Sequence, residues 1–422
     1  IELPVDVRKI ISRLNEAGYE AFAVGGCIRD SILGREPEDW DITTSATPQE
    51  IKRVFERTVD TGIKHGTVTV LIKHGLSDVD PEKYELRPYE VTTYRIDGEY
   101  KDGRHPEKVS FTPLLREDLR RRDFTINAMA YNDDIGLVDE FEGLLDMERK
   151  LIRCVGDPDE RFTEDALRIL RAARFSAQIG FETERETRDA IRRHAANLSK
   201  VSKERIQAEL AKLLCSAHPE KVLELSELGM QEQICGGFGE LDLGVFSEIA
   251  GDEGFSEIPV KDRYRRYAVL LSGCDEESCR SILRELRVDN DTLHRACLLV
   301  KKLFVPIESD AYAIKLAMQD MDPELFSELL ELKRRFSGTE RYRRSCEGED
   351  VAALGDIFRY IMRREDPIYQ KDLIVKGSDL IKAGMEPGER LGSMLRDMHD
   401  EVLRHPEHNS ILFLFNKFFY GG

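Results

Sequence analysis

The sequence predicts an α+β fold: a small mixed α/β head with an antiparallel-rich sheet, followed by an all-α neck, body and tail. Within the first 150 residues, β-branched and apolar runs at 21–24, 67–72 and 89–94 favour strands. From about residue 164 onward, apolar residues recur at helical spacing, first over 166–173. A Gly-Asp-Pro turn signal at 156–158 separates the two patterns.

Length and composition set the organisation that we expect. A chain of 422 residues with 41% hydrophobic and 34% charged residues suits two or three soluble, helix-rich domains. We expect a head over 1–150, a helical neck over 151–215, and a helical body and tail over 216–422. No apolar run approaches the roughly 18 residues that span a bilayer, so no membrane partner is expected.

The 8 cysteines are scattered singly, and no histidine cluster accompanies them. A zinc site or disulfide framework built on them is therefore not expected, and reduced thiols favour a cytoplasmic location. We also expect no signal peptide.

The charge distribution is uneven. The net charge of -18 argues against non-specific binding to nucleic-acid phosphates. Between residues 168 and 212, however, eleven basic residues face six acidic ones, which gives a local net charge of about +5. Such a stretch is either a solvated helix face or an RNA-contacting surface, and charge alone leaves both readings open.

A pair of carboxylates stands out in the head. Asp39 and Asp41 are two residues apart, so in a strand both side chains point to the same face. Two carboxylates on one face repel each other unless a cation lies between them, and hard cations such as Mg²⁺ prefer oxygen ligands. A pair of these ions can activate a 3′ hydroxyl and stabilise a leaving pyrophosphate.

A double glycine precedes that pair. Gly25 and Gly26 follow a predicted strand and precede a predicted helix, so backbone N–H groups could approach a triphosphate closely. Arg29 could pair with its oxygens. Alone, a double glycine is usually a turn and Asp-x-Asp a solvated edge, but at this spacing the two together favour a nucleotide site.

These residues resemble the family of class II tRNA nucleotidyltransferases and bacterial poly(A) polymerases. The first motif spans residues 25–44, and Arg-Arg-Asp-Phe-Thr-Ile-Asn-Ala at 121–128 matches the second. Glu-Asp-Ala-Leu-Arg at 164–168, continued by two arginines, matches the nucleotide-selecting motif, and 202–210 resembles the last neck motif. Four motifs in the family's order make this a specific resemblance.

The resemblance implies roles residue by residue. Asp39 and Asp41 would hold Mg²⁺, with Glu90 as a third catalytic carboxylate beside them. Asp165 and Arg168 would face the incoming base. The implied nucleotide-binding residues are Gly25, Gly26, Arg29, Arg121, Arg122, Asp123, Asn127, Asp165, Arg168, Arg171 and Arg174.

The selecting pair also has a chemical rationale of its own. Asp165 and Arg168 are three residues apart, which predicts one shared helical face. Aspartate only accepts and arginine only donates, which matches the amine and ring-nitrogen edge of cytosine and adenine. Uracil and guanine present the reverse pattern and would leave buried groups unpaired. The alternative is a simple helix salt bridge.

The function expected from the resemblance is template-independent addition of CCA to the 3′ end of tRNA from CTP and ATP. Its partners would be the tRNA acceptor end and these two nucleotides, and not DNA. The closest alternatives are an enzyme that adds only the terminal A and a poly(A) polymerase. Residues 62–70 lack the basic Gly-Arg-Arg-Phe-like stretch of the polymerases, and a glycine-rich, charged loop at 97–106 favours addition of the A.

Two alternatives come from other classes. A non-catalytic RNA-binding protein on the same scaffold would be expected to lack Asp39 or Asp41, and both are present. A metal phosphohydrolase would need an ordered set of histidines upstream of His399 and Asp400, which the sequence does not supply.

Overall fold

The structure is a computed structural model that describes residues 1–75, 84–98, 109–252, 255 and 257–420. Apart from residues 97 and 98, the loop expected at 97–106 lies outside the described residues. The chain forms two compact units. The first comprises 1–247, 251–260 and 285–287, and the second comprises 248–250, 261–284 and 288–422.

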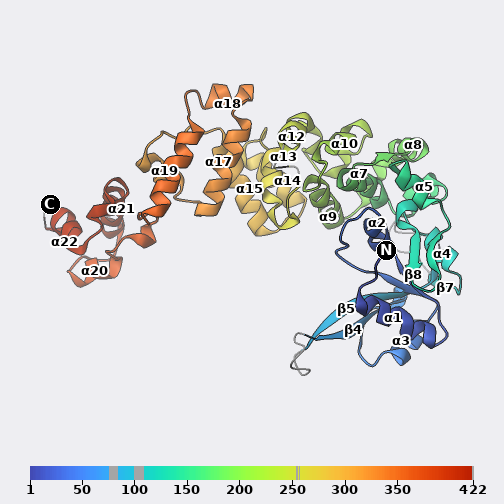
Figure 1. The fold of residues 1–422 in the computed structure, drawn as a ribbon. Helices are drawn as coiled ribbons and strands as arrows, with labels where there is room; N and C mark the ends of the chain where they lie inside the picture. Colours follow the sequence, from blue (N-terminus) through green and yellow to red (C-terminus); the bar gives the residue numbers. More distant parts are fainter. Residues whose placement is uncertain (76–83, 99–108, 253–254, 256, 421–422) are drawn as a thin grey trace. The chain divides into compact units, whose positions relative to one another are not determined.

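A seven-stranded sheet lies in the first unit (Figure 1). Its strands are β1 (Ala21–Val24), β2 (Ile42–Thr44), β3 (Thr58–Gly62), β4 (Thr67–Gly75), β5 (Tyr84–Thr93), β8 (Met129–Asn132) and β9 (Gly136–Asp139). Their order across the sheet is β3-β4-β5-β2-β1-β8-β9, and every neighbouring pair is antiparallel except β2 with β5. The predicted antiparallel-rich sheet is confirmed.

Short elements surround this sheet. Helices α1 (Val5–Glu16) and α3 (Pro48–Val54) pack against it and lie near each other in Figure 1. Helix α3 begins with proline at its first position, behind a capping box in which Glu50 accepts from the Thr47 backbone N–H at 2.7 Å. The remaining elements are α2 (Gly26–Ile32), β6 (Arg95–Asp97), β7 (Val109–Phe111), α4 (Leu115–Arg120), α5 (Gly143–Glu148), β10 (Leu151–Ile152) and β11 (Glu182–Thr183).

The sheet is anchored by a buried apolar cluster. Phe22 and Val24 of β1 pack with Tyr94, Leu119 and Val155, all at most 2% exposed. Because both faces of β1 are buried, its sequence is a continuous apolar run rather than an alternating one. The end of β1 is thereby held rigidly, and this is where the glycine turn begins.

Helices complete the first unit. The longest of them, α7 and α9, pack against each other, and α6 packs against α8. Helix α7 ends at Gly180, whose φ of 71° is the left-handed conformation common at helix C-termini. The helices are α6 (Pro158–Glu164), α7 (Leu167–Ile179), α8 (Arg185–His194), α9 (Lys203–Leu214), α10 (Glu224–Glu227) and α11 (Gln231–Ile234), with α12 (Leu243–Ala250) crossing into the second unit.

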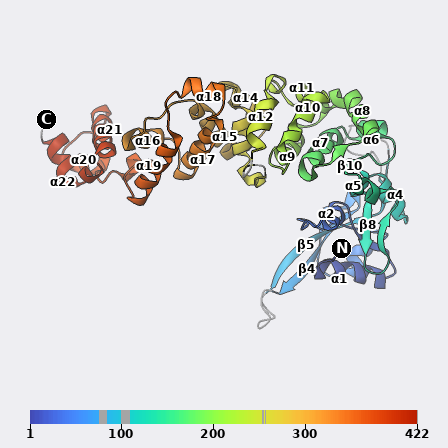
Figure 2. The same cartoon turned by 45° about the horizontal axis from the view of Figure 1, so that its top comes forward.

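Every secondary-structure element described in the second unit is a helix, and turns and loops join these helices. In Figure 2, α17 lies between α15 and α19, and it contacts both. Asp289, Asp310, Asp322 and Asp350 cap four of its helices by accepting backbone N–H groups, which are otherwise unsatisfied at a helix start. Its helices are α13 (Tyr264–Leu270), α14 (Glu276–Glu285), α15 (Asn290–Leu303), α16 (Ala311–Ala317), α17 (Pro323–Phe336), α18 (Glu340–Ser345), α19 (Val351–Arg363), α20 (Gly377–Lys382), α21 (Glu389–Arg404) and α22 (Ile411–Leu414).

Three further features relate to expectations from the sequence. None of the helices described is both long enough and apolar enough to cross a membrane. All eight cysteines are free, and only Cys274 is not buried. His399 is buried and its Nε2 lies 3.0 Å from the Ile368 carbonyl oxygen, as expected of an ordinary helix residue.

Candidate active site

The double glycine forms the turn between β1 and α2, as the sequence predicted. Gly25 has a φ of 89°, a conformation that L side chains rarely adopt. A Cβ on Gly25 would also lie 2.9 Å from Nη1 of Arg122. The positive φ therefore favours glycine here, and the Arg122 guanidinium lies against the turn at which the sequence predicts a triphosphate.

The three carboxylates converge on the same end of the sheet. Asp39 and Asp41 lie just before β2 rather than within it, although the Val24 N–H donates to the Asp41 carbonyl at 3.0 Å. Parallel β2 and β5 pair Ile42 with Val91, so Asp41 and Glu90 directly precede paired positions on adjacent strands. The backbone pairing of the sheet therefore extends to Asp41, one residue before β2 begins.

The electrostatics at these carboxylates favour a cation. Surrounding protein desolvates Asp41 and raises its pKa; Arg122 opposes this rise and Asp39 adds to it. Desolvation also raises the pKa of Glu90, and the charges of Asp41 and Asp39 raise it further. The like charges are thus incompletely neutralised by protein groups, which is the condition under which a divalent cation binds favourably.

The donor set fits a divalent ion that shares its ligands with a substrate. The ligand atoms of Asp39, Asp41 and Glu90 do not all lie within 4.8 Å of one another. Mg²⁺ is typically held by one or two carboxylates together with substrate phosphates rather than by an all-protein cage. These residues offer oxygen ligands and leave the other coordination positions of the metal open to a substrate.

Asp118, which the sequence analysis missed, positions two of the predicted arginines. Its carboxylate is fully buried, accepts from Nη2 of Arg121 at 2.8 Å, and lies 3.5 Å from Nη2 of Arg122. Thr43 of β2 donates to it at 3.1 Å. Burial favours a raised pKa for Asp118, but the two arginines outweigh burial and lower it. Asp118 precedes Arg121 by three residues and Arg122 by four, and this spacing could have predicted the ion pairs from the sequence.

A second buried carboxylate connects the sheet to α7. Asp123 accepts from Nε of Arg171 at 2.7 Å and from Nδ2 of Asn127 at 3.2 Å. The Asn127 amide oxygen in turn accepts from Nη1 of Arg29 at 2.7 Å, and Arg29 also pairs with Asp30 at 2.9 Å. Four residues predicted for the site, Arg171, Asp123, Asn127 and Arg29, are therefore linked in a row by hydrogen bonds. Asn127 and Arg29 are 98 positions apart in the sequence.

Three guanidinium groups surround one aromatic ring. Those of Arg174, Arg29 and Arg171 lie 3.8, 4.9 and 5.2 Å from the centre of the Phe175 ring. At these distances the ring face attracts each cation. Glu209 of α9 lies 2.6 Å from Nε of Arg174, and burial lowers the pKa of Arg174 to about 10 although Glu209 opposes this. Neither Phe175 nor Glu209 was identified from the sequence.

The expected helical face shared by Asp165 and Arg168 is wrong. Asp165 follows α6 in an extended conformation with φ −144°, and α7 begins only at Leu167. The Asp165 carboxylate accepts from the Leu167 N–H at 3.1 Å, so it caps α7 instead of continuing α6. Aspartate is a poor helix-interior residue and a good cap, which explains the break.

Asp165 and Arg168, the two residues predicted to select the base, are instead held by separate partners. Both carboxylate oxygens of Asp165 accept from Arg205, at 2.7 and 3.2 Å, a bidentate pair that sequence reasoning missed. Arg168 donates to Glu164 at 2.5 Å and to the carbonyl of Arg121 at 3.0 Å. Arg168 therefore contacts the second motif and Asp165 contacts the last neck motif.

The Asp123 carboxylate should make stability depend on acidity. Burial favours a raised pKa for Asp123, but Arg171 and Arg168 together with hydrogen bonds from Arg171 and Asn127 lower it strongly. A lowered folded-state pKa gives stability that is complete above the ordinary aspartate value near 4 and is lost as pH falls below it. The wild-type free energy of unfolding should therefore fall steeply between about pH 4 and pH 2, and less steeply in Asp123→Asn.

Urea unfolding at a series of pH values measures both slopes. Asp133→Asn is the matched control, because Asp133 forms an exposed ion pair with Arg8 that contributes little. Equal slopes in wild type and Asp123→Asn would contradict the assignment of acid sensitivity to this pair.

Comparisons with known proteins agree with this geometry. The poly A polymerase head domain model matches residues 21–153, and the model of the RNA- and SrmB-binding site of polymerase A matches 180–235. A third model, tRNA nucleotidyltransferase domain 2, matches 260–411. Together the three cover the sheet, helices α8 to α11 and most of the second unit, whereas α6 and α7 lie between the first two matches.

Relatives and solved structures are similar over nearly the whole chain. A CCA-adding enzyme of Limosilactobacillus fermentum is 37% identical over 94% of this chain and 92% of its own length. One of Leuconostoc mesenteroides is 36% identical over the same shares. The solved structure of the Bacillus stearothermophilus CCA-adding enzyme in complex with CTP has a TM-score of 0.79 and 28% identity, covering 99% and 98% of the two chains. This chain therefore belongs to the CCA-adding enzymes of the tRNA nucleotidyltransferase family.

Proposed function

We propose that this chain adds C, C and A in turn to the 3′ end of tRNA, taking the nucleotides from CTP and ATP and releasing diphosphate. One observation carries the proposal: Asp39, Asp41 and Glu90 lie at the sheet end where Gly25 turns beneath Arg122. Relatives named CCA-adding enzymes cover the chain, and solved structures of such enzymes are described with CTP, with ATP and with tRNA. We prefer this function to A-only addition and to poly(A) synthesis.

Membership of this family implies dependence on a divalent metal, and Mg²⁺ is the ion that we propose. Asp39 and Asp41 would hold it, with Glu90 as the adjacent third carboxylate. When bound, the metal activates the tRNA 3′ hydroxyl and neutralises charge that develops on the leaving diphosphate. The raised pKa values of Asp41 and Glu90 support a cation at this position.

The arginines would bind the triphosphate and the ribose. Gly25 and Gly26 leave room for phosphate oxygens at the turn, and Arg122 lies against it. Arg29 and Arg121 retain N–H donors beyond those that Asp30, Asn127 and Asp118 occupy, because each guanidinium carries five. Their protein partners fix the orientation of these groups before a nucleotide arrives.

Asp165 and Arg168 would select the base. The aspartate offers only acceptors and the arginine only donors, which suits the pairing edges of cytosine and adenine. Arg205 holds Asp165, and Glu164 together with the carbonyls of Arg121 and Arg161 holds Arg168. Asp165 lies before α7 and Arg168 lies within it, which changes how the two groups are positioned. Their hydrogen-bonding match to cytosine and adenine does not depend on a shared helical face.

The tRNA acceptor end would contact the basic part of the neck and the helices that follow. Arg192 and Arg193 of α8 are exposed and lie in the stretch of positive local charge. Phosphate and shape contacts suit recognition of many tRNAs without base readout. The division into a head at 1–150, a neck at 151–215 and a body at 216–422, like the cytoplasmic location, remains a prediction.

Single-nucleotide incorporation tests the proposed reaction. The purified protein, given Mg²⁺, CTP, ATP and tRNA that lacks CCA, should add two C residues and then one A, and stop. Asp41→Asn should reduce incorporation by at least about 1,000-fold while tRNA binding is retained, because electrostatic stabilisation of the transition state is lost. Asp133→Asn, a remote surface change, is the control.

The products separate the alternatives. Incorporation of A only onto tRNA ending in CC would show A-only addition, and a long A ladder on any RNA would show poly(A) synthesis. If Asp41→Asn were as active as the control, the assignment of this carboxylate to the metal would be wrong.

Base selection makes a second prediction. Arg168→Ala should lower kcat/KM for CTP and ATP by about 10–100-fold and narrow discrimination against UTP and GTP, since the donor half of the pairing edge is removed. Arg8→Ala is the matched control, because Arg8 is an exposed arginine outside the basic part of the neck and pairs with Asp133. Kinetics with each of the four nucleotides supply the ratios. An equal loss for all four would assign Arg168 to phosphate binding or to structure instead.

A further inference from the structure

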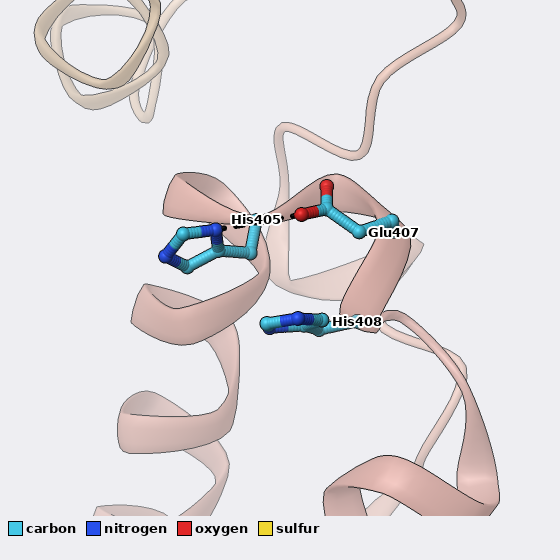
Figure 3. Close-up of side chains that lie close together, drawn as sticks. All are labelled: His405, Glu407 and His408. Carbon is cyan, nitrogen blue, oxygen red and sulfur yellow. Dashed lines mark ion pairs between the residues drawn. The ribbon is translucent and has the colours of Figure 1, made fainter.

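A compact group of potential metal ligands lies in the second unit, whereas the proposed catalytic residues belong to the first. His405, Glu407 and His408 each offer a ligand atom, and these atoms all lie within 4.8 Å of one another. Figure 3 shows the two imidazole rings one above the other, with the Glu407 carboxylate beside His405. Among the residues that the structure describes, no other group of three histidine, cysteine or acidic residues meets this distance.

The local backbone brings these side chains together. Residues Pro406–His408 form a single 3₁₀ turn after α21, in which the His408 N–H donates to the His405 carbonyl at 2.9 Å. Side chains three residues apart eclipse each other in a 3₁₀ turn. The ring centres of the two histidines accordingly lie 4.8 Å apart, and Nδ1 of His405 lies 3.5 Å from Glu407.

His408 is further oriented by residues outside the turn. Its Nδ1 lies 2.8 Å from Oε1 of Glu401 in α21, and Lys417 lies 2.7 Å from the other oxygen of Glu401. The His408 ring also stacks on Phe413 of α22, with centres 3.9 Å apart. An imidazole that donates through Nδ1 to a carboxylate presents the lone pair of Nε2, which is the arrangement found behind metal-binding histidines.

We propose that His405, Glu407 and His408 bind one Zn²⁺, with water completing the coordination. Two imidazoles and a carboxylate are a donor set that suits zinc, whereas Mg²⁺ prefers oxygen ligands alone. Glu401 acts through His408 and is a positioning residue. Because the turn joins α21 to α22, the ion would stabilise the packing of the last two helices.

Zinc titration of the full-length chain tests the site. The protein is first stripped with chelator and then titrated calorimetrically with Zn²⁺ in excess Mg²⁺, which occupies oxygen-only sites. Wild type should bind one Zn²⁺ per chain, and Co²⁺ should give the visible absorption of a low-coordinate site. Thermal melting with and without Zn²⁺ should show stabilisation of wild type.

Four variants test the site: two change proposed ligands, one changes the positioning residue, and one is a control. His405→Gln and Glu407→Gln change exposed side chains and should abolish tight binding while the metal-free melting temperature stays as in wild type. Glu401→Gln should weaken binding by about 10–100-fold, as loss of a supporting partner does. His218→Gln is the matched control, since His218 lies 3.3 Å from Glu220 as an exposed pair and should change nothing.

The proposal is overturned if wild type shows no saturable zinc binding, or if His405→Gln and Glu407→Gln bind as tightly as wild type. These outcomes are independent of nucleotide addition, because binding and melting are measured without tRNA or nucleotide.

Discussion

The active site depends on buried carboxylates that hold arginine side chains in place. Asp118 and Asp123 are nearly inaccessible, and each is compensated by at least one guanidinium at 2.7 to 2.8 Å. A buried carboxylate without such a partner is costly, so breaking either pair should cost several kcal/mol. Arginine suits this task because its planar fork can satisfy a carboxylate and still offer donors to a phosphate. The positive charge at the proposed nucleotide site is therefore positioned before substrate binds.

The same pairs connect parts of the first unit that are distant in sequence. Asp123, next to the sheet, pairs with Arg171 of α7, and Arg168 donates to the carbonyl of Arg121. The proposed metal carboxylates and the proposed base-selecting residues consequently belong to one compact unit. A nucleotide whose phosphates contact the glycine turn and whose base contacts α7 would be read by groups whose separation is fixed. We propose that this fixed separation is the physical basis for protein-directed choice of C and A without a template.

Local features could be predicted from the sequence, and long-range partners could not. The strand Ala21–Val24 and the glycine turn after it depend on neighbouring residues, so their pattern was sufficient. Asp39 and Asp41 were expected within a strand but lie just before β2. The shared helical face of Asp165 and Arg168 was wrong because Asp165 caps α7, a choice that helical spacing does not reveal. Its partner Arg205 is 40 residues away, and no periodicity links the two. The His405 group was missed because it forms on a single 3₁₀ turn, which apolar periodicity does not detect.

A double-mutant cycle between Asp123 and Arg171 tests most directly whether the buried pair organises the site. The melting temperature and the CTP dissociation constant would be measured for Asp123→Asn, Arg171→Gln, the double variant and wild type. If the pair acts as a unit, each single change should weaken CTP binding, and the double change should cost less than their sum by about 0.5–3 kcal/mol. Strictly additive losses in both quantities would contradict the account, because they would mean that the two residues act independently.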